Sequence, residues 1–318
     1  MTSSPPRTRP RFSLLSRRNA PYLFIAPFFA LFVIFGVFPT LYGLLVSFTK
    51  LRLTDLGNLP WNGFENYTFT LTRDPWFWKS IANTLTLGVF GLLIQPIAVV
   101  LAFTIHFSLK RVRGLVIAMY FLPYITSTVA VAIIFSMVFS KNVGILNAAL
   151  SYLNGLPMLG LLIPDGNVDW LGNPNTVKPA IALVVLWKYL GWNVLLYIGR
   201  LQAIPHELYE AARVDGATTA QQFWNITLPQ LRAIIFFNVT LTIIGQMQLF
   251  DEPYTLVGKD GAVGQSGLTV AMYLFNTMTE FKEAGTAAAM GWILFVFILA
   301  LNLVNNRLFG AEARARGD

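Results

Sequence analysis

The sequence contains no cysteine, and only 12% of its 318 residues are charged. The absence of cysteine excludes a disulfide framework, a thiol nucleophile and a cysteine metal site. Soluble domains of average composition carry about 25% charged residues. Here 55% of the residues are hydrophobic and the mean hydropathy is +0.58. The chain is therefore not an ordinary soluble domain.

Residues that carry catalytic or metal chemistry are also scarce. There are two histidines, and His206-Glu207 is not followed by the second histidine of a zinc-protease motif. No G-x-x-x-x-G-K-[ST] loop occurs, so no ATP site of that type is expected on this chain. Asp251-Glu252, near the outer end of an apolar segment, is the one pair of neighbouring carboxylates in these segments. We therefore expect neither an enzyme nor a metal site nor a cofactor on this chain.

Six apolar segments are each long enough to cross a bilayer as a helix, which needs about 20 residues. They cover residues 22–48, 81–107, 113–139, 178–202, 232–257 and 285–308. None of them alternates with a two-residue period, which argues against membrane strands. The sequence predicts an all-α integral membrane protein with six transmembrane helices.

Lysine and arginine are distributed unevenly between the two sides of this arrangement. Fourteen of them lie on one side, in the basic tail 1–21, the connection 108–113, the interval 200–232 and the C-terminal residues from 307 on. The longer loops opposite carry 8. Positive residues are enriched in cytoplasmic connections. We therefore expect both termini in the cytoplasm of a bacterial or archaeal cell and the chain in its inner membrane. The net charge of +8 then reflects topology, so no nucleic acid partner is expected.

The tail contains Ser16-Arg17-Arg18, which resembles a twin-arginine export signal. The apolar run that follows is far longer than a signal-peptide core and lacks a small-x-small cleavage site. We expect the tail to stay attached.

Two outer loops have distinctive compositions. Residues 59–80 hold seven aromatic residues, which fits interfacial anchors or a docking surface. Residues 141–178 contain breakers around Pro157, Pro164 and Pro174, and a loop of that length suggests a small external cap.

Polar side chains inside the fourth and fifth spans mark a candidate pathway, because such groups are costly in lipid. Helical spacing groups Lys188, Tyr189, Trp192 and Asn193 in one span, and Thr242, Gln246, Leu249 and Asp251 in or beside one stripe of the next. Aromatic faces beside amides suit a sugar, whose C–H face stacks and whose hydroxyls need hydrogen bonds. Polar contacts between helices are the alternative, and the sequence leaves both open.

The interval 205–230 is polar yet helical. Glu207 and Glu210 lie in the first turns of a predicted helix, and the small residues Ala211 and Ala212 allow close approach of another surface. Asp215-Gly216 ends that helix. Thr218 with Gln221, or Thr219 with Gln222, begins a second helix through a capping box, and Pro229 opens the fifth span.

These residues carry a specific resemblance. Glu210-Ala211-Ala212, then Asp215-Gly216-Ala217, then Ile226-Thr227-Leu228-Pro229 resemble the EAA signature of ABC-importer permeases. Phe64-Glu65-Asn66-Tyr67, Leu201-Gln202-Ala203-Ile204-Pro205 and Phe250-Asp251 resemble the sugar-importer branch, which holds the maltose, trehalose, multiple-sugar and glycerol-3-phosphate permeases. The resemblance covers about residues 20–310 and implies the type I (MetI-like) permease fold.

In that family two related permeases pair across a substrate path. An EAA helix of each sits in a cleft of a cytoplasmic ATPase homodimer, which holds ATP and Mg²⁺, and an extracytoplasmic binding protein delivers the substrate. The resemblance implies ATPase coupling by Glu207, Glu210, Ala211, Ala212, Asp215, Gly216, Ala217, Leu228 and Pro229. It implies sugar contacts by Lys188, Tyr189, Trp192, Thr242, Gly245, Gln246 and Leu249. Lys188 and Leu249 differ in chemistry from the maltose-type member, so the sugar itself does not transfer. The chain lacks the tail typical of the second permease of such pairs, which indicates the first permease of a heterodimer.

The cargo and two other functional classes can be compared with this prediction. Lys188 suits an anionic cargo such as a sugar phosphate, or else a structural ion pair. An ion-coupled secondary transporter would show inverted repeats, and none is evident. A membrane enzyme would need His, Asp or Ser gathered at one depth, which the spans do not supply.

Overall fold

The computed structural model describes residues 20–55, 57–109, 111–155 and 166–310. The predictions for most of the N-terminal tail, for residues 311–318 and for Pro157 and Pro164 lie outside these ranges. The described chain is helical, with isolated β-bridges only, so the predicted all-α class is confirmed. The helices are α1 Ala20–Phe32, α2 Phe38–Ser47, α3 Glu65–Thr72, α4 Pro75–Leu92, α5 Ile94–Ser108, α6 Arg113–Ile125, α7 Thr128–Val138, α8 Ile145–Asn154, α9 Val177–Leu201, α10 His206–Val214, α11 Thr219–Gln222, α12 Leu228–Met247, α13 Asp251–Val257, α14 Val270–Thr279 and α15 Ala284–Asn305.

Five helical runs in the described chain are long and apolar enough to cross a membrane, and a bent pair brings the number to six if it counts as one span. The five runs are Pro21–Ser47, Pro75–Ser108, Val177–Leu201, Thr219–Met247 and Ala284–Asn305. The second run begins before residue 81 because the Asp74 carboxylate caps it. Its Oδ1 accepts from the backbone N–H groups of Trp76 at 3.0 Å and Phe77 at 3.1 Å. Trp76, Phe77 and Trp78 therefore belong to α4 and not to a loop.

The third expected span, 113–139, is not one straight helix. It consists of α6 and α7, which meet at an angle of 97°. The backbone turns extended at Thr126 and Ser127, with ψ of 144° and 130°. The Thr126 hydroxyl donates to the carbonyl of Leu122 at 2.9 Å, so it satisfies one of the acceptors that the helix end would leave unpaired. Apolar length alone does not reveal this break.

The fifth expected span, 232–257, also has different limits. The helix runs without interruption from Thr219 to Met247. Pro229 lies in its interior, directly after a π-helical turn at Phe223–Thr227. The chain then breaks, and Asp251 begins the separate short helix α13.

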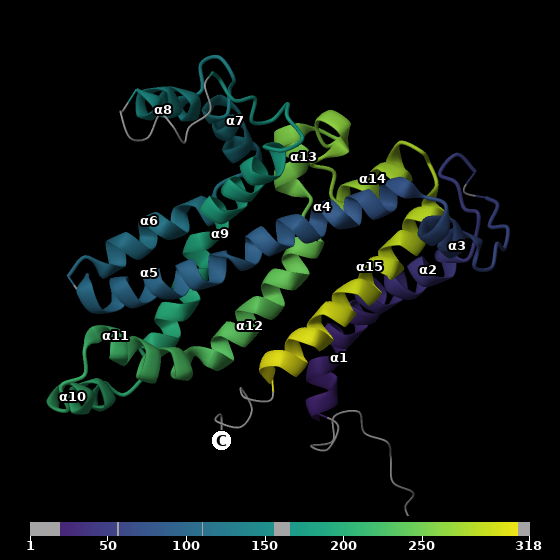
Figure 1. Cartoon of the computed structure of the whole chain (residues 1–318). Coiled ribbons are helices and arrows are strands. Elements are labelled where there is room, and N and C mark those ends of the chain that lie inside the picture. Colours follow the sequence, from purple (N-terminus) through teal and green to yellow (C-terminus); the bar gives the residue numbers. More distant parts are fainter. Residues whose placement is uncertain (1–19, 56, 110, 156–165, 311–318) are drawn as a thin grey trace, which may run out of the picture.

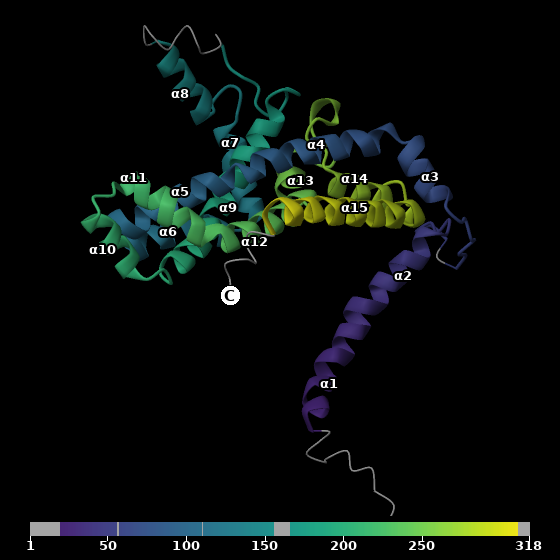
Figure 2. The same ribbon diagram turned by 60° about the horizontal axis from the view of Figure 1, so that its bottom comes forward.

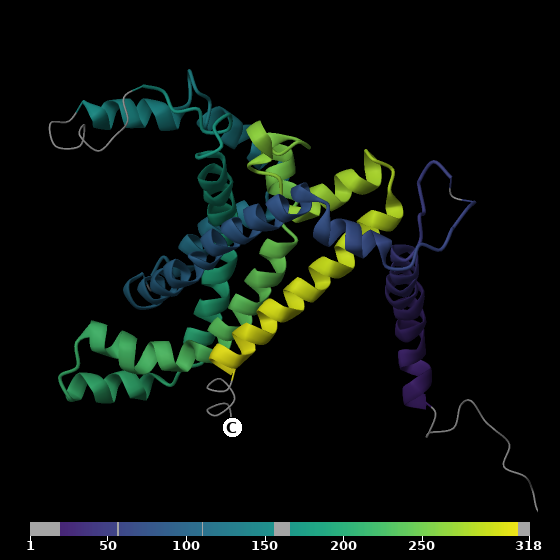
Figure 3. The same cartoon turned by 45° about the vertical axis from the view of Figure 1, so that its right-hand side comes forward.

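Helix α9 lies at the centre of the bundle, packed against α5 and α6. Helix α12 packs against α4, and α15 packs against α14 and α2. Figures 1 and 3 show α10 and α11 at one end of the molecule, together with the described start of α1 and the end of α15. Helices α8, α13 and α14 lie at the opposite end.

The N-terminal run projects away from the other helices (Figure 2), and its most apolar window of 18 residues is not buried. Burial begins at Val46 and Ser47, where α2 packs against α15. Only its end is fixed to the bundle. The Asn66 amide donates to the carbonyls of Ser47 and Thr49, both at 2.8 Å. Gly285 lies so close to the Thr49 carbonyl that an added Cβ would be 2.1 Å from its oxygen.

The predicted external cap corresponds to α8 and the chain that returns to α9. Asn147 joins them, since its amide donates to the carbonyls of Lys141 at 3.0 Å and Val168 at 2.9 Å. Its oxygen accepts from the Trp170 indole at 2.9 Å. One buried side chain thus holds the described part of this loop together.

A buried ion pair links α9 to the start of α7 and to α13. The Lys188 ammonium donates to Glu252 Oε1 at 2.8 Å and to the Thr128 hydroxyl at 2.6 Å. The Lys188 and Glu252 side chains are only 8% and 3% exposed. The pair therefore fixes α7 and α13 against the central helix.

Close packing of α6 on α9 depends on Gly191. An added Cβ there would lie 1.7 Å from the Tyr120 carbonyl oxygen.

We expect Gly191→Ala to separate the two helices and to lower the thermal unfolding temperature of the purified protein by several degrees. Gly199→Ala, on the same helix with open space around it, is the control, and it should be neutral or stabilising, because alanine favours a helix over glycine by about 1 kcal/mol. Equal stability of the two variants would contradict this packing.

The buried ion pair gives a second prediction. Lys188→Met leaves the Glu252 carboxylate buried without its cation, a change that typically costs about 3–5 kcal/mol. The double variant Lys188→Met/Glu252→Gln removes both charges, so it should recover most of the thermal stability in a double-mutant cycle. A double variant no more stable than Lys188→Met would show that the two side chains are not coupled.

Candidate functional site

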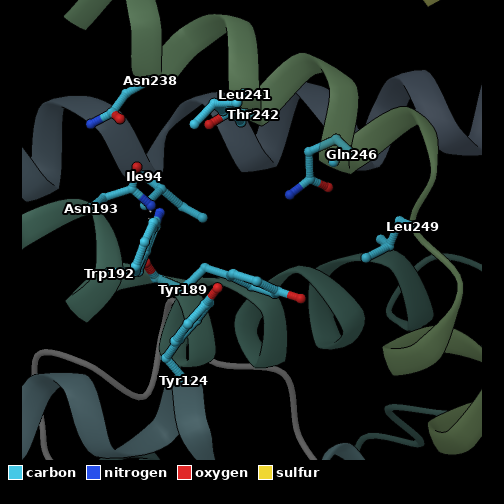
Figure 4. A pocket seen from close by; sticks show the side chains of 11 residues that line it. Ile94, Tyr124, Tyr189, Trp192, Asn193, Asn238, Leu241, Thr242, Gln246 and Leu249 are labelled. Carbon is cyan, nitrogen blue, oxygen red and sulfur yellow. Dashed lines mark hydrogen bonds between the residues drawn. The ribbon is translucent and has the colours of Figure 1, made fainter. Parts of the chain in front are cut away.

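A cavity of about 180 Å³ lies between α5, α6, α9 and α12, close to the break before α13. Its walls hold three aromatic side chains, three amides and one hydroxyl among apolar groups (Figure 4). The lining residues are Ile94, Tyr124, Tyr189, Trp192, Asn193, Asn238, Leu241, Thr242, Gly245, Gln246 and Leu249.

One wall of the cavity is aromatic. The rings of Tyr124 and Trp192 stack, with centroids 5.0 Å apart and planes within 19° of parallel. Tyr189 meets Tyr124 edge to face at 5.9 Å. Because Tyr124 comes from α6 and the other two from α9, the α6–α9 contact through Gly191 positions this wall.

The polar side of the cavity is held by Gln95, which is buried behind it. The Gln95 amide donates to Asn193 Oδ1 at 3.1 Å and to the Thr242 hydroxyl at 2.7 Å. The Gln95 oxygen accepts in turn from the Tyr197 hydroxyl. Asn193 Nδ2 donates to the Tyr189 carbonyl at 2.9 Å. The two stripes on α9 and α12 are therefore fixed relative to each other through α5.

Gln246 offers an unused acceptor at this site. Its side chain is buried, and its Oε1 has no hydrogen-bond partner within the described ranges. Gly91 makes room for it, since a Cβ on Gly91 would lie 2.5 Å from the Gln246 amide. Figure 4 shows this amide beside the cavity, opposite Tyr189. A buried acceptor without a partner is costly, and both amide atoms of Asn238 on the same wall share this state.

Seven of the nine predicted pathway residues line this one cavity: Tyr189, Trp192, Asn193, Thr242, Gly245, Gln246 and Leu249. Lys188 and Asp251 do not. Lys188 points to Glu252 and Thr128, because residues 188 and 189 lie on different faces of α9. Asp251 lies exposed at the first residue of α13, because the chain leaves α12 at Gln248.

Sequence reasoning missed four lining residues and the residue that pairs with Lys188. Asn238 and Leu241 continue the α12 stripe by one helical turn, so spacing alone contained a signal for them. Tyr124 and Ile94 come from other helices and carry no such signal. Glu252 was noted as a neighbour of Asp251, but its pairing with Lys188 spans 64 residues.

The expected coupling residues lie at the end of the molecule that holds α10 and α11, opposite the end that holds α13 (Figure 1). Glu207, Glu210, Ala211, Asp215 and Gly216 are exposed, and Ala212, Ala217, Leu228 and Pro229 are half-buried. They belong to α10, to the turn after it and to the start of α12. These residues therefore form an accessible surface.

Helix α10 is fixed rigidly to the long helix that follows. It ends in a Schellman turn, in which Gly216 has φ of 77° and the Ala217 N–H donates to the Ala212 carbonyl at 2.8 Å. Thr218 and Gln221 form the capping box of the next helix. The buried Tyr209 hydroxyl lies 2.9 Å from the Thr227 hydroxyl. Burial raises the pKa of the Tyr209 phenol, so this contact persists at neutral pH.

The sequence was compared with known proteins. The family described as "Binding-protein-dependent transport system inner membrane component" matches residues 96–311. The arabinooligosaccharides transport permease AraP of Bacillus subtilis is 32% identical over 298 residues, covering 93% of this chain and 90% of that protein. The lactose transport permease LacF of Rhizobium radiobacter is 30% identical, covering 89% and 91%. The sulfoquinovosyl glycerol transport permease SmoG of Agrobacterium fabrum is also 30% identical, covering 92% and 91%.

A solved structure has the same fold along nearly the whole chain. A bacterial ABC transporter involved in the import of the acidic polysaccharide alginate superposes with a TM-score of 0.74 at 26% identity, covering 95% of this chain and 97% of its own. A bacterial alginate ABC transporter in complex with an alginate pentasaccharide-bound periplasmic protein gives a TM-score of 0.76, covering 92% of this chain and 94% of its own. The fold is thus the MetI-like permease fold, and the chain belongs to the family of inner membrane components of binding-protein-dependent transport systems.

Proposed function

We propose that this chain forms half of the translocation path of an ABC importer for a carbohydrate, a mono- or oligosaccharide. The observation that carries the proposal is the cavity between α5, α6, α9 and α12, where stacked aromatic faces lie opposite amide and hydroxyl groups. This combination matches a sugar ring, which presents C–H faces for stacking and hydroxyls for hydrogen bonds. Relatives named for arabinooligosaccharides and lactose support the same class of cargo.

The cytoplasmic end of the chain is proposed to be the end that holds α10. The count of 14 basic residues against 8 supports this orientation. The described start of α1 and the end of α15 lie at the same end as α10 (Figure 1). Both termini and the interval 205–230 would then face the cytoplasm of the cell.

Helix α10 is proposed to seat in a cleft of a separate cytoplasmic ATPase, which carries ATP and Mg²⁺. The exposed surface of α10 and its rigid turn support that role. The helix Thr219–Met247 has 29 residues, and at about 1.5 Å per residue it reaches some 43 Å. It contacts α10 through Thr227, which pairs with Tyr209, and its last turns carry Thr242, Gly245 and Gln246 of the cavity. A displacement of α10 would therefore move one wall of the cavity.

The remaining proposed partners are a second permease and an extracytoplasmic binding protein. Helices α5, α6, α9 and α12 of this chain line the cavity, and we propose that a second, different permease supplies the rest of its wall. An extracytoplasmic binding protein would deliver the substrate to the end that holds α8 and α13, as the complex of the alginate transporter suggests.

The aromatic wall gives a test of the carbohydrate site. Trp192→Ala removes a stacking surface and should lower saccharide uptake by intact cells about tenfold or more, since a buried aromatic contact is typically worth 2 kcal/mol or more. Trp187→Ala, on the same helix but outside the cavity, is the control and should leave uptake within about twofold. Equal uptake by the two variants, at matched amounts in the membrane, would exclude Trp192 from the path.

The coupling surface gives a separate test. Glu210→Lys reverses one exposed charge on α10 without touching the core. We expect it to lower both uptake and co-purification of the ATPase about tenfold, as for the loss of one interfacial charge pair. Asp260→Lys makes the same change at an exposed position beyond α13, at the opposite end of the molecule, and should leave co-purification of the ATPase unchanged. Unchanged uptake in Glu210→Lys would show that α10 is not the coupling element.

A further inference from the structure

We propose that Glu252 sets the charge specificity of this half of the path, so that the cavity accepts uncharged saccharides and disfavours acidic ones. This inference rests on the proposed function and narrows its substrate class. It is not inherited from the family. Relatives and structural neighbours are named for neutral cargo, such as lactose, and for acidic cargo, such as alginate and sulfoquinovosyl glycerol.

The cavity wall carries no formal charge. All eleven lining residues are aromatic, aliphatic, glycine, amide or hydroxyl residues. An acidic sugar would bring a carboxylate, sulfonate or phosphate into a site with no Lys or Arg on its described walls. Burying such a group without a cation costs far more than burying a hydroxyl.

The nearest cation, Lys188, is bound elsewhere. It precedes the cavity residue Tyr189, and its Nζ lies 5.5 Å from the centre of the Tyr189 ring. Two of its three donor hydrogens are taken by Glu252 at 2.8 Å and Thr128 at 2.6 Å. With only 6% of the residue exposed, Lys188 is not available to an anionic ligand while Glu252 holds it.

Glu252 also determines how Tyr189 meets a ligand. The Tyr189 hydroxyl donates its single hydrogen to Glu252 Oε1 at 3.0 Å. The phenolic oxygen can then offer only its lone pairs to the cavity. Lone pairs accept from a sugar hydroxyl and repel an anionic oxygen.

A second carboxylate strengthens the same preference. Asp251 is exposed at the start of α13, two residues after Leu249 of the cavity wall. Lys188, Glu252 and Asp251 are thus one cation and two carboxylates next to this wall. Their net charge is negative, so it repels an anionic cargo and has no such effect on a neutral one.

The test measures saccharide binding to the complete transporter in nanodiscs. The complex is purified by a tag on this chain together with its membrane and ATPase partners. The binding protein is left out, because its own selectivity would otherwise contribute. The probes are matched pairs that differ only in CH₂OH against carboxylate: galactobiose with digalacturonate, mannobiose with dimannuronate, and cellobiose with cellobiouronic acid. Calorimetric titration should show a neutral member of a pair binding at least about tenfold more tightly than its acidic counterpart.

Glu252→Gln is the informative variant, because glutamine keeps an acceptor for Lys188 and Tyr189 and removes only the charge. It should reduce the gap between neutral and acidic members to about threefold or less, as the charge of Lys188 is no longer cancelled. Lys188→Gln/Glu252→Gln removes both charges and should restore the preference for the neutral member.

Each outcome bears on a different claim. An acidic member that binds wild type as tightly as its neutral counterpart, or a gap that Glu252→Gln leaves unchanged, overturns the charge assignment and leaves the carbohydrate function standing. If no saccharide of either kind binds, the proposed function itself fails and the charge assignment falls with it.

Discussion

Within a membrane, a polar side chain must find its partner inside the protein, because lipid offers none. The architecture of this chain depends on how it meets that constraint. Gln95 joins α5, α9 and α12, Lys188 joins α7, α9 and α13, and Asn66 joins the N-terminal run to the bundle. Apolar packing between helices provides little direction in lipid, since the tails are as apolar as leucine. The polar contacts therefore decide which helices meet and in which register.

The same contacts explain why the cavity has its composition. Asn193 and Thr242 are oriented by Gln95, so their remaining hydrogen-bonding capacity faces the space between α9 and α12. Gln246 retains an acceptor because no described group reaches its Oε1. Both amide atoms of Asn238, another residue of the wall, are likewise without a described partner. The polar side of the cavity is therefore not fully satisfied by the described part of the chain.

Local spacing in the sequence was enough to predict the two polar stripes, because Tyr189 to Asn193 and Thr242 to Gln246 follow helical periodicity within single elements. The turn at Gly216 was predictable for the same reason, since only nearby residues determine a positive φ. The α6–α7 bend was not, because the third apolar segment is long enough to cross the membrane either way. Tyr124 joins the site through that bend and through the close approach at Gly191. Its place is set by tertiary packing, and no pattern of spacing encodes it.

The residue type of Lys188 suggests a different role from the one that its partner Glu252 gives it. An intramembrane lysine beside a candidate path is a natural ligand for an anion, and its neighbours Tyr189 and Trp192 do line the cavity. The carboxylate that holds it arrives from α13, a helix that exists only because the chain breaks after Met247. A continuous fifth span through residue 257 would have given Glu252 another position, and Lys188 would have lacked this partner. The break in α12 is therefore what allows Glu252 to pair with Lys188.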